Sequence, residues 1–182
     1  SHAVAWIDVG VGRGIYSAGD FVADQRAAPP ARALRKPFTP PLSVVTPATV
    51  SAFNALYWRR PVEADGLVHW RPYFHPLDGV SDWNRMYGPR GFVQYQCVLP
   101  PPAMRDAMAD LLRTMQRRRE ASFLAVLKTL GTRQPAGMLS FPRAGATLAV
   151  DFPFRGERTL RLLRELDAIV RAAGGALYPA RA

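Results

Sequence analysis

The sequence predicts an α+β domain with a ferredoxin-like core, in which helices cover one face of an antiparallel sheet. Two observations predict this fold. In the second half of the chain, patterns typical of strands and amphipathic helices follow one another in the order β-α-β-β-α-β, which is the split βαβ arrangement. The 182 residues, 48% of them hydrophobic, also suit one globular domain with a packed core.

The first residues predict a hairpin that widens this sheet. Residues 3–10 alternate in the way a strand does, and residues 14–22 supply a second strand after three closely spaced glycines. Residues 26–47 then hold many of the 17 prolines of the chain. Because proline favours extended backbone, we expect an extended connection here.

A helix and a broken strand complete the first half. Thr46 is a suitable N-cap and Pro47 a suitable first helical residue, so a helix is expected over 48–58. Its inward stripe comprises Val50, Phe53, Asn54 and Tyr57. Residues 66–74 have the composition of a strand that Pro72 interrupts.

The second half contains the six elements of the predicted core. The strands are expected at 91–98, 121–129, 146–153 and 176–178, and the helices at 103–118 and 157–172. Each helix carries an apolar stripe. The stripes comprise Met104, Met108, Leu111, Leu112 and Met115 in the first helix, and Leu160, Leu163, Leu166, Ile169 and Val170 in the second. Gly174 and Gly175 end the second helix, as glycines commonly do.

The charge of the chain is strongly basic, with a formal net charge of +10. Such a balance is compatible with nucleic acid, an anionic membrane or a phosphorylated substrate. However, only Lys36 and Lys128 of the 24 basic residues are lysine, a skew that fits coding bias. The densest cluster, 117–119, lies at an expected helix C-terminus, where cations complement the helix dipole. We therefore predict no nucleic-acid partner.

Targeting and metal-binding signals are absent from the sequence. It contains no run of about 18 apolar residues and no signal peptide, which predicts a cytoplasmic protein without a transmembrane segment. The initial Ser1-His2 is typical of residues left by cleavage of an affinity tag. Cys97 is the only cysteine, so neither a disulfide framework nor a metal site is expected. We interpret Cys97 as a buried structural residue.

One face of the predicted sheet carries unexpected polar side chains. Because side chains alternate along a strand, Gln94 and Gln96 share a face, and Lys128 can point to the same patch. Two amides and an ammonium group suit a ligand with hydroxyls and a phosphate, or a polar ring. The alternative is a solvated sheet face without function, since antiparallel sheets often expose one face to water.

Several segments together resemble a known family. They are "FHPLDGVSDWNRMYGPRGFVQYQCVLP", "SFLAVLKTLG", "GMLSFPRAG", "LAVDFP" and "ELDAIVRAAGGALYPA", in this order. They resemble decaprenylphosphoryl-ribose oxidases and their bacterial relatives, which are FAD-linked oxidases of the vanillyl-alcohol-oxidase superfamily. The resemblance is dense over 66–180 and thin over 24–60.

The resemblance implies a two-domain protein of which this chain is one part. Residues 3–180 would form the substrate-binding (cap) domain, and the FAD-binding domain would be absent from this chain. The intact protein would bind FAD and oxidise a sugar hydroxyl of a polyprenylphosphoryl-pentose-like substrate to a ketone, by hydride transfer to the flavin. Its partners would be this small-molecule or lipid-linked sugar substrate and the missing FAD-binding domain.

The resemblance also assigns roles to individual residues. Gln94 and Gln96 match the family's substrate-pocket glutamines, and Lys128 matches its pocket lysine. Phe74 falls where the family often has tyrosine, beside a loop that shields the substrate. Tyr178 matches a tyrosine close to the flavin.

Three positions depart from the family pattern. Thr147 and Ala149 stand where the mycobacterial member has asparagine and cysteine, so covalent capture by nitroaromatic inhibitors is expected to fail. Arg181 stands where a catalytic-site lysine is expected, near the cofactor. Arginine keeps the charge but does not readily give up a proton. Lys128 and Arg181 are therefore the candidates for a catalytic role.

Two other functions remain open from the sequence. A flavin-free module could use the same sheet face to bind a phosphorylated lipid or sugar. A nucleic-acid-binding ferredoxin-like domain is a more distant alternative, because it requires aromatic residues exposed together on the central strands. Phe92 and Tyr95 point to opposite faces of their strand, which does not favour it.

Overall fold

The structure is a computed structural model that describes most of the chain. The described residues are 2–23, 34–35, 40–59, 65–74, 80–120, 122–133, 137 and 140–179. Much of the connection expected at 26–47 therefore lies outside them, as does Arg181.

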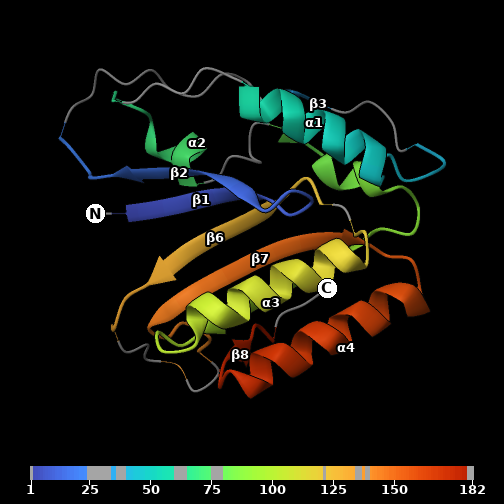
Figure 1. The fold of residues 1–182 in the computed structure, drawn as a ribbon. Coiled ribbons are helices and arrows are strands. Elements are labelled where there is room, and N and C mark those ends of the chain that lie inside the picture. Colours follow the sequence, from blue (N-terminus) through green and yellow to red (C-terminus); the bar gives the residue numbers. More distant parts are fainter. Residues whose placement is uncertain are drawn as a thin grey trace.

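Eight strands and four α-helices make up this part of the chain, together with a 3-10 helix (Figure 1). The strands are β1 (His2–Asp8), β2 (Arg13–Gly19), β3 (Leu34–Arg35), β4 (Val80–Ser81), β5 (Phe92–Leu99), β6 (Ala125–Leu130), β7 (Gly145–Pro153) and β8 (Ala176–Leu177). The helices are α1 (Pro47–Arg59), α2 (Trp70–Phe74), α3 (Met104–Arg117), α4 (Glu157–Ala172) and the 3-10 helix η2 (Trp83–Tyr87).

One six-stranded sheet organises the molecule. Its strand order is β2-β1-β6-β7-β5-β8, and every neighbouring pair is antiparallel. Strands β3 and β4 form a separate two-stranded parallel sheet. The α+β class is confirmed, as are the hairpin at the start and the helices and strands of the second half. The ferredoxin-like assignment of the core stays a prediction.

One predicted strand is wrong. Residues 66–69 are irregular, and the chain then forms the short helix α2 instead of a strand. Pro72 lies in the first turn of this helix, where the backbone N–H groups have no partner within the helix and a missing one is tolerated. Tyr73 then donates a hydrogen bond from its hydroxyl to the Ser17 carbonyl, 3.2 Å away, which attaches α2 to β2.

Helix α1 begins at the predicted N-cap. The Oγ1 atom of Thr46 accepts a hydrogen bond from the Thr49 backbone N–H at 3.2 Å, and Thr49 Oγ1 accepts one from the Thr46 N–H at 3.0 Å. The pair is thus a reciprocal cap built from two threonines, similar in logic to a capping box. It sets the point at which the chain turns from an extended segment into α1.

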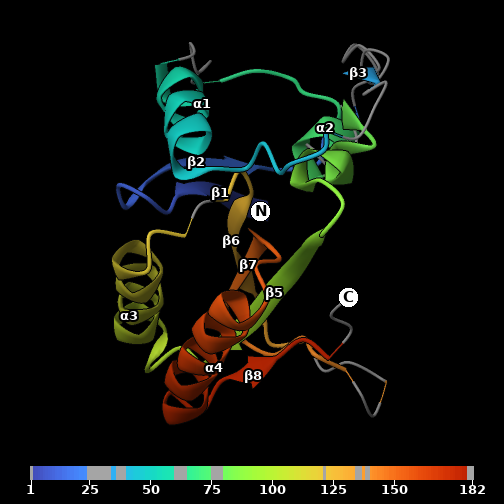
Figure 2. The same cartoon turned by 90° about the vertical axis from the view of Figure 1, so that its right-hand side faces the viewer.

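The main core lies between the sheet and the helices α3 and α4, which pack side by side on one face (Figures 1 and 2). Tyr95 and Cys97 of β5 and Leu148 of β7 are fully or almost fully buried there, against Leu111 of α3 and Leu166 of α4. Alternation along the strands brings these side chains to the helical face. The interpretation of Cys97 as a buried structural residue is confirmed.

The inward stripes of the helices differ from the prediction at particular positions. Leu160 of α4 is 40% exposed, and Leu162 is buried in its place. On α1, Val50 and Asn54 are buried, but Phe53 is 43% exposed. The apolar pattern alone does not fix the rotation of a helix to within one residue when leucines occur on adjacent positions.

The opposite face of the sheet is only partly open. Helix α1 covers β1 on this side: the Trp6 and Tyr57 rings lie 4.7 Å apart, and Asn54 Nδ2 donates to Asp8 Oδ1 at 2.8 Å. Figure 1 shows α1 and the α3–α4 layer on opposite sides of the sheet. The two core helices α3 and α4 lie on one face of the sheet as predicted, and α1 covers part of the other face. Its Val50 joins Val45 and Tyr87 of η2 in a second, smaller core.

The close approach of β5 and β7 at Gly145 generates a stability prediction. A Cβ atom at Gly145 would lie 1.9 Å from the Leu99 carbonyl oxygen, and φ is +143°. Gly145→Ala should therefore lower the free energy of unfolding by about 3 kcal/mol or prevent folding. Urea denaturation followed by circular dichroism measures this change.

Gly131→Ala is the matched control, because a Cβ atom there meets nothing within 4 Å. It should leave the midpoint of unfolding close to that of the unsubstituted protein. Equal effects of the two substitutions would contradict the assigned role of Gly145.

Candidate functional site

Strands β5, β6 and β7 bring four of the predicted site residues onto one face of the sheet. Gln96 lies directly opposite Ala149 in the β5–β7 pair, and Thr147 lies directly opposite Lys128 in the β6–β7 pair. Residues opposite each other in antiparallel strands share a face. Their neighbours along the strands are the core residues that face α3 and α4, so these four point to the other side.

The accessibility of these side chains changes across the face. Thr147 is buried, Gln96 is half-buried and Lys128 is exposed. Gln96 Nε2 donates a long hydrogen bond of 3.4 Å to Thr147 Oγ1. This contact occupies one of the two amide protons of Gln96, so its carbonyl oxygen and second proton can serve a ligand.

Gln94 and Asp151 form the next pair on the same face. They lie directly opposite each other in the β5–β7 register. Asp151 is 0% exposed, and neither of its carboxyl oxygens makes a hydrogen bond of ordinary length to a described residue. Burial raises the pKa of the Asp151 carboxyl to about 6, and a loose interaction with the Gln94 side chain offsets part of this rise.

The second core explains why the Asp151 carboxyl is shielded from solvent. Tyr87 of η2 is buried and stacks on Phe92 of β5 with 4.7 Å between the ring centroids, and Trp83 also packs against Phe92. Burial, and secondarily the charge of Asp151, raise the pKa of the Tyr87 hydroxyl. The hydroxyl therefore stays protonated beside the carboxyl.

Asp151 was not among the predicted site residues, although the sequence carries a sign of its unusual position. The strand "ATLAVDFP" is apolar except for Thr147 and Asp151, both on the face away from the helices. Carboxylates are rarely fully buried without a partner. Recognising Asp151 as buried, however, required the position of η2, which the pattern does not supply.

Of the other predicted site residues, Tyr178 adjoins this face and Phe74 packs elsewhere. Tyr178 follows β8 and its backbone N–H donates to the Gln96 carbonyl at 2.9 Å, so it adjoins β5. Its ring packs edge-on against Phe141, 5.3 Å away. Phe74 belongs to α2 and contacts Phe21 and Tyr73 instead. Arg181 lies outside the described residues.

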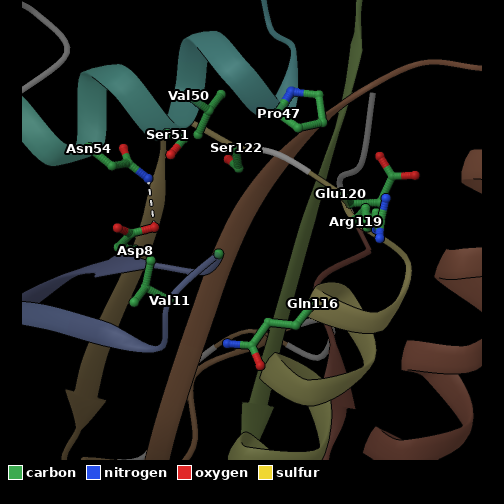
Figure 3. Close-up of a pocket in the computed structure, with 11 residues that line it drawn as sticks. Asp8, Val11, Pro47, Val50, Ser51, Asn54, Gln116, Arg119, Glu120 and Ser122 are labelled. Carbon is green, nitrogen blue, oxygen red and sulfur yellow. Dashed lines mark hydrogen bonds between the residues drawn. The ribbon is translucent and has the colours of Figure 1, made fainter.

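A cavity of about 240 Å³ lies elsewhere, between α1, the β1–β2 turn and the end of α3 (Figure 3). Asp8, Asn54, Gln116 and Glu120 are among the residues that line it, and none of the predicted site residues does. The sequence had placed Asn54 on the inward stripe of its helix but had not predicted this cavity.

The polar groups of the cavity mostly serve one another. Asp8 accepts a hydrogen bond from the Asn54 side-chain amide, and Gln116 Nε2 donates one to the Val9 carbonyl at 2.9 Å. The buried Glu120 carboxylate is held by Arg155 at 3.1 Å and Arg158 at 2.7 Å. These contacts join β1, α1, α3 and α4, so we interpret the cavity as a by-product of a structural network.

The described ranges show neither a metal-binding cluster nor a membrane-spanning helix. They contain no group of three or more histidine, cysteine or acidic side chains placed to hold a metal ion. None of the helices in this part of the chain is long and apolar enough to cross a membrane. The sheet face around Gln96 is thus the site that the geometry brings together from the predicted residues.

Comparison with known proteins bears on this site. No family model matches the chain. The chain is similar to an oxidase. Over 109 residues it is 40% identical to decaprenylphosphoryl-beta-D-ribose oxidase of Mycolicibacterium smegmatis, a match that covers 60% of this chain and 23% of that protein. This similarity confirms the resemblance that the sequence motifs indicated.

A second relative is an uncharacterised protein in the mprA 5′ region of Streptomyces coelicolor. It is 36% identical over 91 residues, which are 50% of this chain and 24% of that protein. The chain therefore spans about a quarter of the length of the decaprenylphosphoryl-beta-D-ribose oxidase and of this second relative.

The buried carboxyl of Asp151 generates a prediction on stability and pH. Its pKa is raised from 3.8 to about 6 on folding, so its contribution to stability is complete below pH 3.8 and is lost as the pH rises through 6. Two pKa units correspond to about 3 kcal/mol. Asp151→Asn cannot ionise, so it should raise the free energy of unfolding by up to about 3 kcal/mol at pH 8 relative to its effect at pH 4.

Urea unfolding at the two pH values measures the difference. Asp110→Asn is the control, because Asp110 is an exposed carboxylate that pairs with Arg113 at 2.7 Å. It should not reproduce the gain at pH 8. A gain for Asp151→Asn that is the same at both pH values would contradict the raised pKa.

Proposed function

We propose that this chain is the substrate-binding domain of an FAD-dependent oxidoreductase that oxidises a sugar hydroxyl to a ketone. The substrate would be a polyprenylphosphoryl pentose or a similar lipid-linked sugar. The observation that carries the proposal is the row of polar side chains Gln94, Gln96, Thr147 and Lys128 on the face of the central strands away from α3 and α4. The similarity to decaprenylphosphoryl-beta-D-ribose oxidase supports it and suggests an oxidoreductase-type domain.

The chemistry of the face suits such a substrate. The amides of Gln94 and Gln96 can each donate to and accept from sugar hydroxyls. Lys128 is exposed at the other side of the face, where an ammonium group can attract a phosphate. Ala149 lies between Gln96 and Val126, and its small side chain leaves room for a ring to approach the sheet.

The residues fit one side of a flavin and not its whole site. The sequence has no glycine-rich phosphate-binding fingerprint, so FAD would be held mainly by another domain. A half-apolar sheet face can cover the flat ring system. Tyr178, which is hydrogen-bonded to β5 beside Gln96, is the described residue proposed to contact the cofactor, and Arg181 is proposed for the same role. A bound flavin would supply the acceptor for the hydride that leaves the sugar carbon.

The residues of this chain would act by orientation and by electrostatics. Gln94 and Gln96 would fix the sugar so that the reacting carbon faces the cofactor, since positioning supplies much of the rate in such reactions. Lys128 would hold the phosphate or stabilise charge near the reacting hydroxyl. The buried second core on one side and the α3–α4 layer behind would keep the sheet rigid.

The first test uses the intact natural gene product. It should be yellow when purified, and its flavin absorbance should bleach when a polyprenylphosphoryl pentose is added without oxygen. A yellow protein that does not bleach would contradict the proposed substrate. A colourless protein that binds the same compound would favour a flavin-free binding module instead.

Lys128 provides a specific prediction in that intact protein. Lys128→Ala removes the ammonium group of the polar face, so kcat/KM for the polyprenylphosphoryl pentose should fall by a factor of about 10 or more, as expected for loss of one charged hydrogen bond. Steady-state kinetics measures the change.

Arg105→Ala is the matched control, since Arg105 is an exposed cation on α3, behind the sheet. Its kcat/KM should equal that of the unsubstituted enzyme. Unchanged kinetics for Lys128→Ala would remove Lys128 from the site.

A further inference from the structure

Asp151 is a buried ionisable group in the described structure, and the proposed function gives it no role. It is 0% exposed, both carboxyl oxygens lack a hydrogen bond of ordinary length to any described residue, and it lies on the face that carries the site. A buried carboxyl that has only a loose interaction with a neighbouring amide is unfavourable, so its presence calls for an explanation. Because it is buried, it can act on a ligand only through a neighbour.

We propose that Asp151 is a positioning residue that sets the orientation of the Gln94 amide, and so decides whether Gln94 offers an oxygen or an N–H to a ligand hydroxyl. The identity of the ligand rests on the proposed function. The coupling between Asp151 and Gln94 does not.

The sheet geometry places the Gln94 amide between Asp151 and the open face where a ligand would bind. Gln94 and Asp151 are cross-strand neighbours, with Cβ atoms expected about 5 Å apart. Gln94 is half-buried, so its amide can face Asp151 on one side and the open face on the other. Among the described side chains, Gln94 is also the one whose interaction partly offsets the rise in the pKa of the Asp151 carboxyl, as a donor to its charged form does.

The protonation state of the Asp151 carboxyl determines which side of the Gln94 amide it attracts. A side-chain amide has a carbonyl that accepts and an NH₂ group that donates. An ionised carboxylate only accepts, so it attracts the NH₂ group and leaves the carbonyl oxygen of Gln94 for a ligand hydroxyl. A protonated carboxyl can donate to the carbonyl oxygen, and the NH₂ group is then turned toward the ligand.

The other groups around Asp151 do not compete for this role. From η2, Tyr87 lies close enough for the charge of Asp151 to raise the pKa of its hydroxyl, but this hydroxyl makes no hydrogen bond of ordinary length to the Asp151 carboxyl. Just before β6, the Leu124 carbonyl accepts the backbone N–H of Asp151. Lys128 lies opposite Thr147, four residues along β7, which corresponds to about 13 Å.

The Asp151 carboxyl titrates within the pH range in which binding and NMR measurements are ordinarily made. Its pKa of about 6 means that the carboxyl is mostly ionised at pH 7.5 and mostly protonated at pH 5. The Gln94 amide should therefore reverse its orientation between these pH values.

The experiment is a pH titration of this chain followed by NMR. The side-chain ¹⁵NH₂ signal of Gln94 and the ¹³C carboxyl signal of Asp151 should shift with one shared midpoint near pH 6. The Gln96 amide, which bonds to Thr147, is the internal control and should not shift at that midpoint. Separate midpoints for Gln94 and Asp151, or a Gln94 signal that does not move, would overturn the proposal without any substitution.

Asp151→Asn then tests causation. The Gln94 signal should lose its transition near pH 6, whereas Asp110→Asn, which removes an exposed carboxylate, should leave it in place. A transition of Gln94 that persists in a folded Asp151→Asn protein would assign it to another group and overturn the proposal.

A ligand titration separates this inference from the proposed function. The probe is a farnesylphosphoryl ribose, whose phosphodiester keeps the same charge at pH 5 and pH 7.5. Its Kd should differ at least fivefold between the two pH values, and Asp151→Asn should reduce this difference to less than twofold. No binding at either pH, with the Gln94 coupling intact, would overturn the proposed substrate and leave the coupling standing. A pH dependence unchanged by Asp151→Asn would overturn the role of Asp151 in ligand choice.

Discussion

The pairing register between β5 and β7 is the constraint on which the rest of this structure depends. It places Tyr95 beside Val150 and Cys97 beside Leu148 on the side of α3 and α4. The same register places Gln94 and Gln96 on the other side. A slip of one residue would turn the glutamines into the core and the apolar residues out of it. The packing of the core and the composition of the polar face are therefore fixed by one set of hydrogen bonds.

The face of the sheet away from α3 and α4 has a covered part and an open part. Over one part, Tyr87, Trp83 and Phe92 form a dry layer that continues the protein interior. Beyond it, Gln96 is half-buried and Thr147 is buried, whereas Lys128, opposite Thr147, is exposed. Asp151 lies within the dry part although it belongs, by register, to the polar row. This boundary position accounts for both its raised pKa and its closeness to Gln94.

The sequence predicted what depends on local pattern and failed where distant segments decide. Strand alternation placed Gln94, Gln96 and Cys97 on the observed faces, and α4 has the predicted bounds of 157–172. The helix of Trp70–Phe74 was missed because Pro72 was taken as a strand break and not as a first-turn residue. The side of the sheet that α1 covers depends on its contacts with β1, which no pattern within α1 expresses.

The position of Cys97 gives the protein a built-in reporter. It is the only cysteine of the chain and lies at 0% exposure in the centre of the α3–α4 core. A thiol reagent can reach it only when this layer opens, so the labelling rate follows the opening equilibrium of the core. Because its neighbour Gln96 points to the other side, ligands can be added to the polar face without blocking the thiol directly. Changes in labelling would then measure how strongly events on one side of the sheet tighten the other.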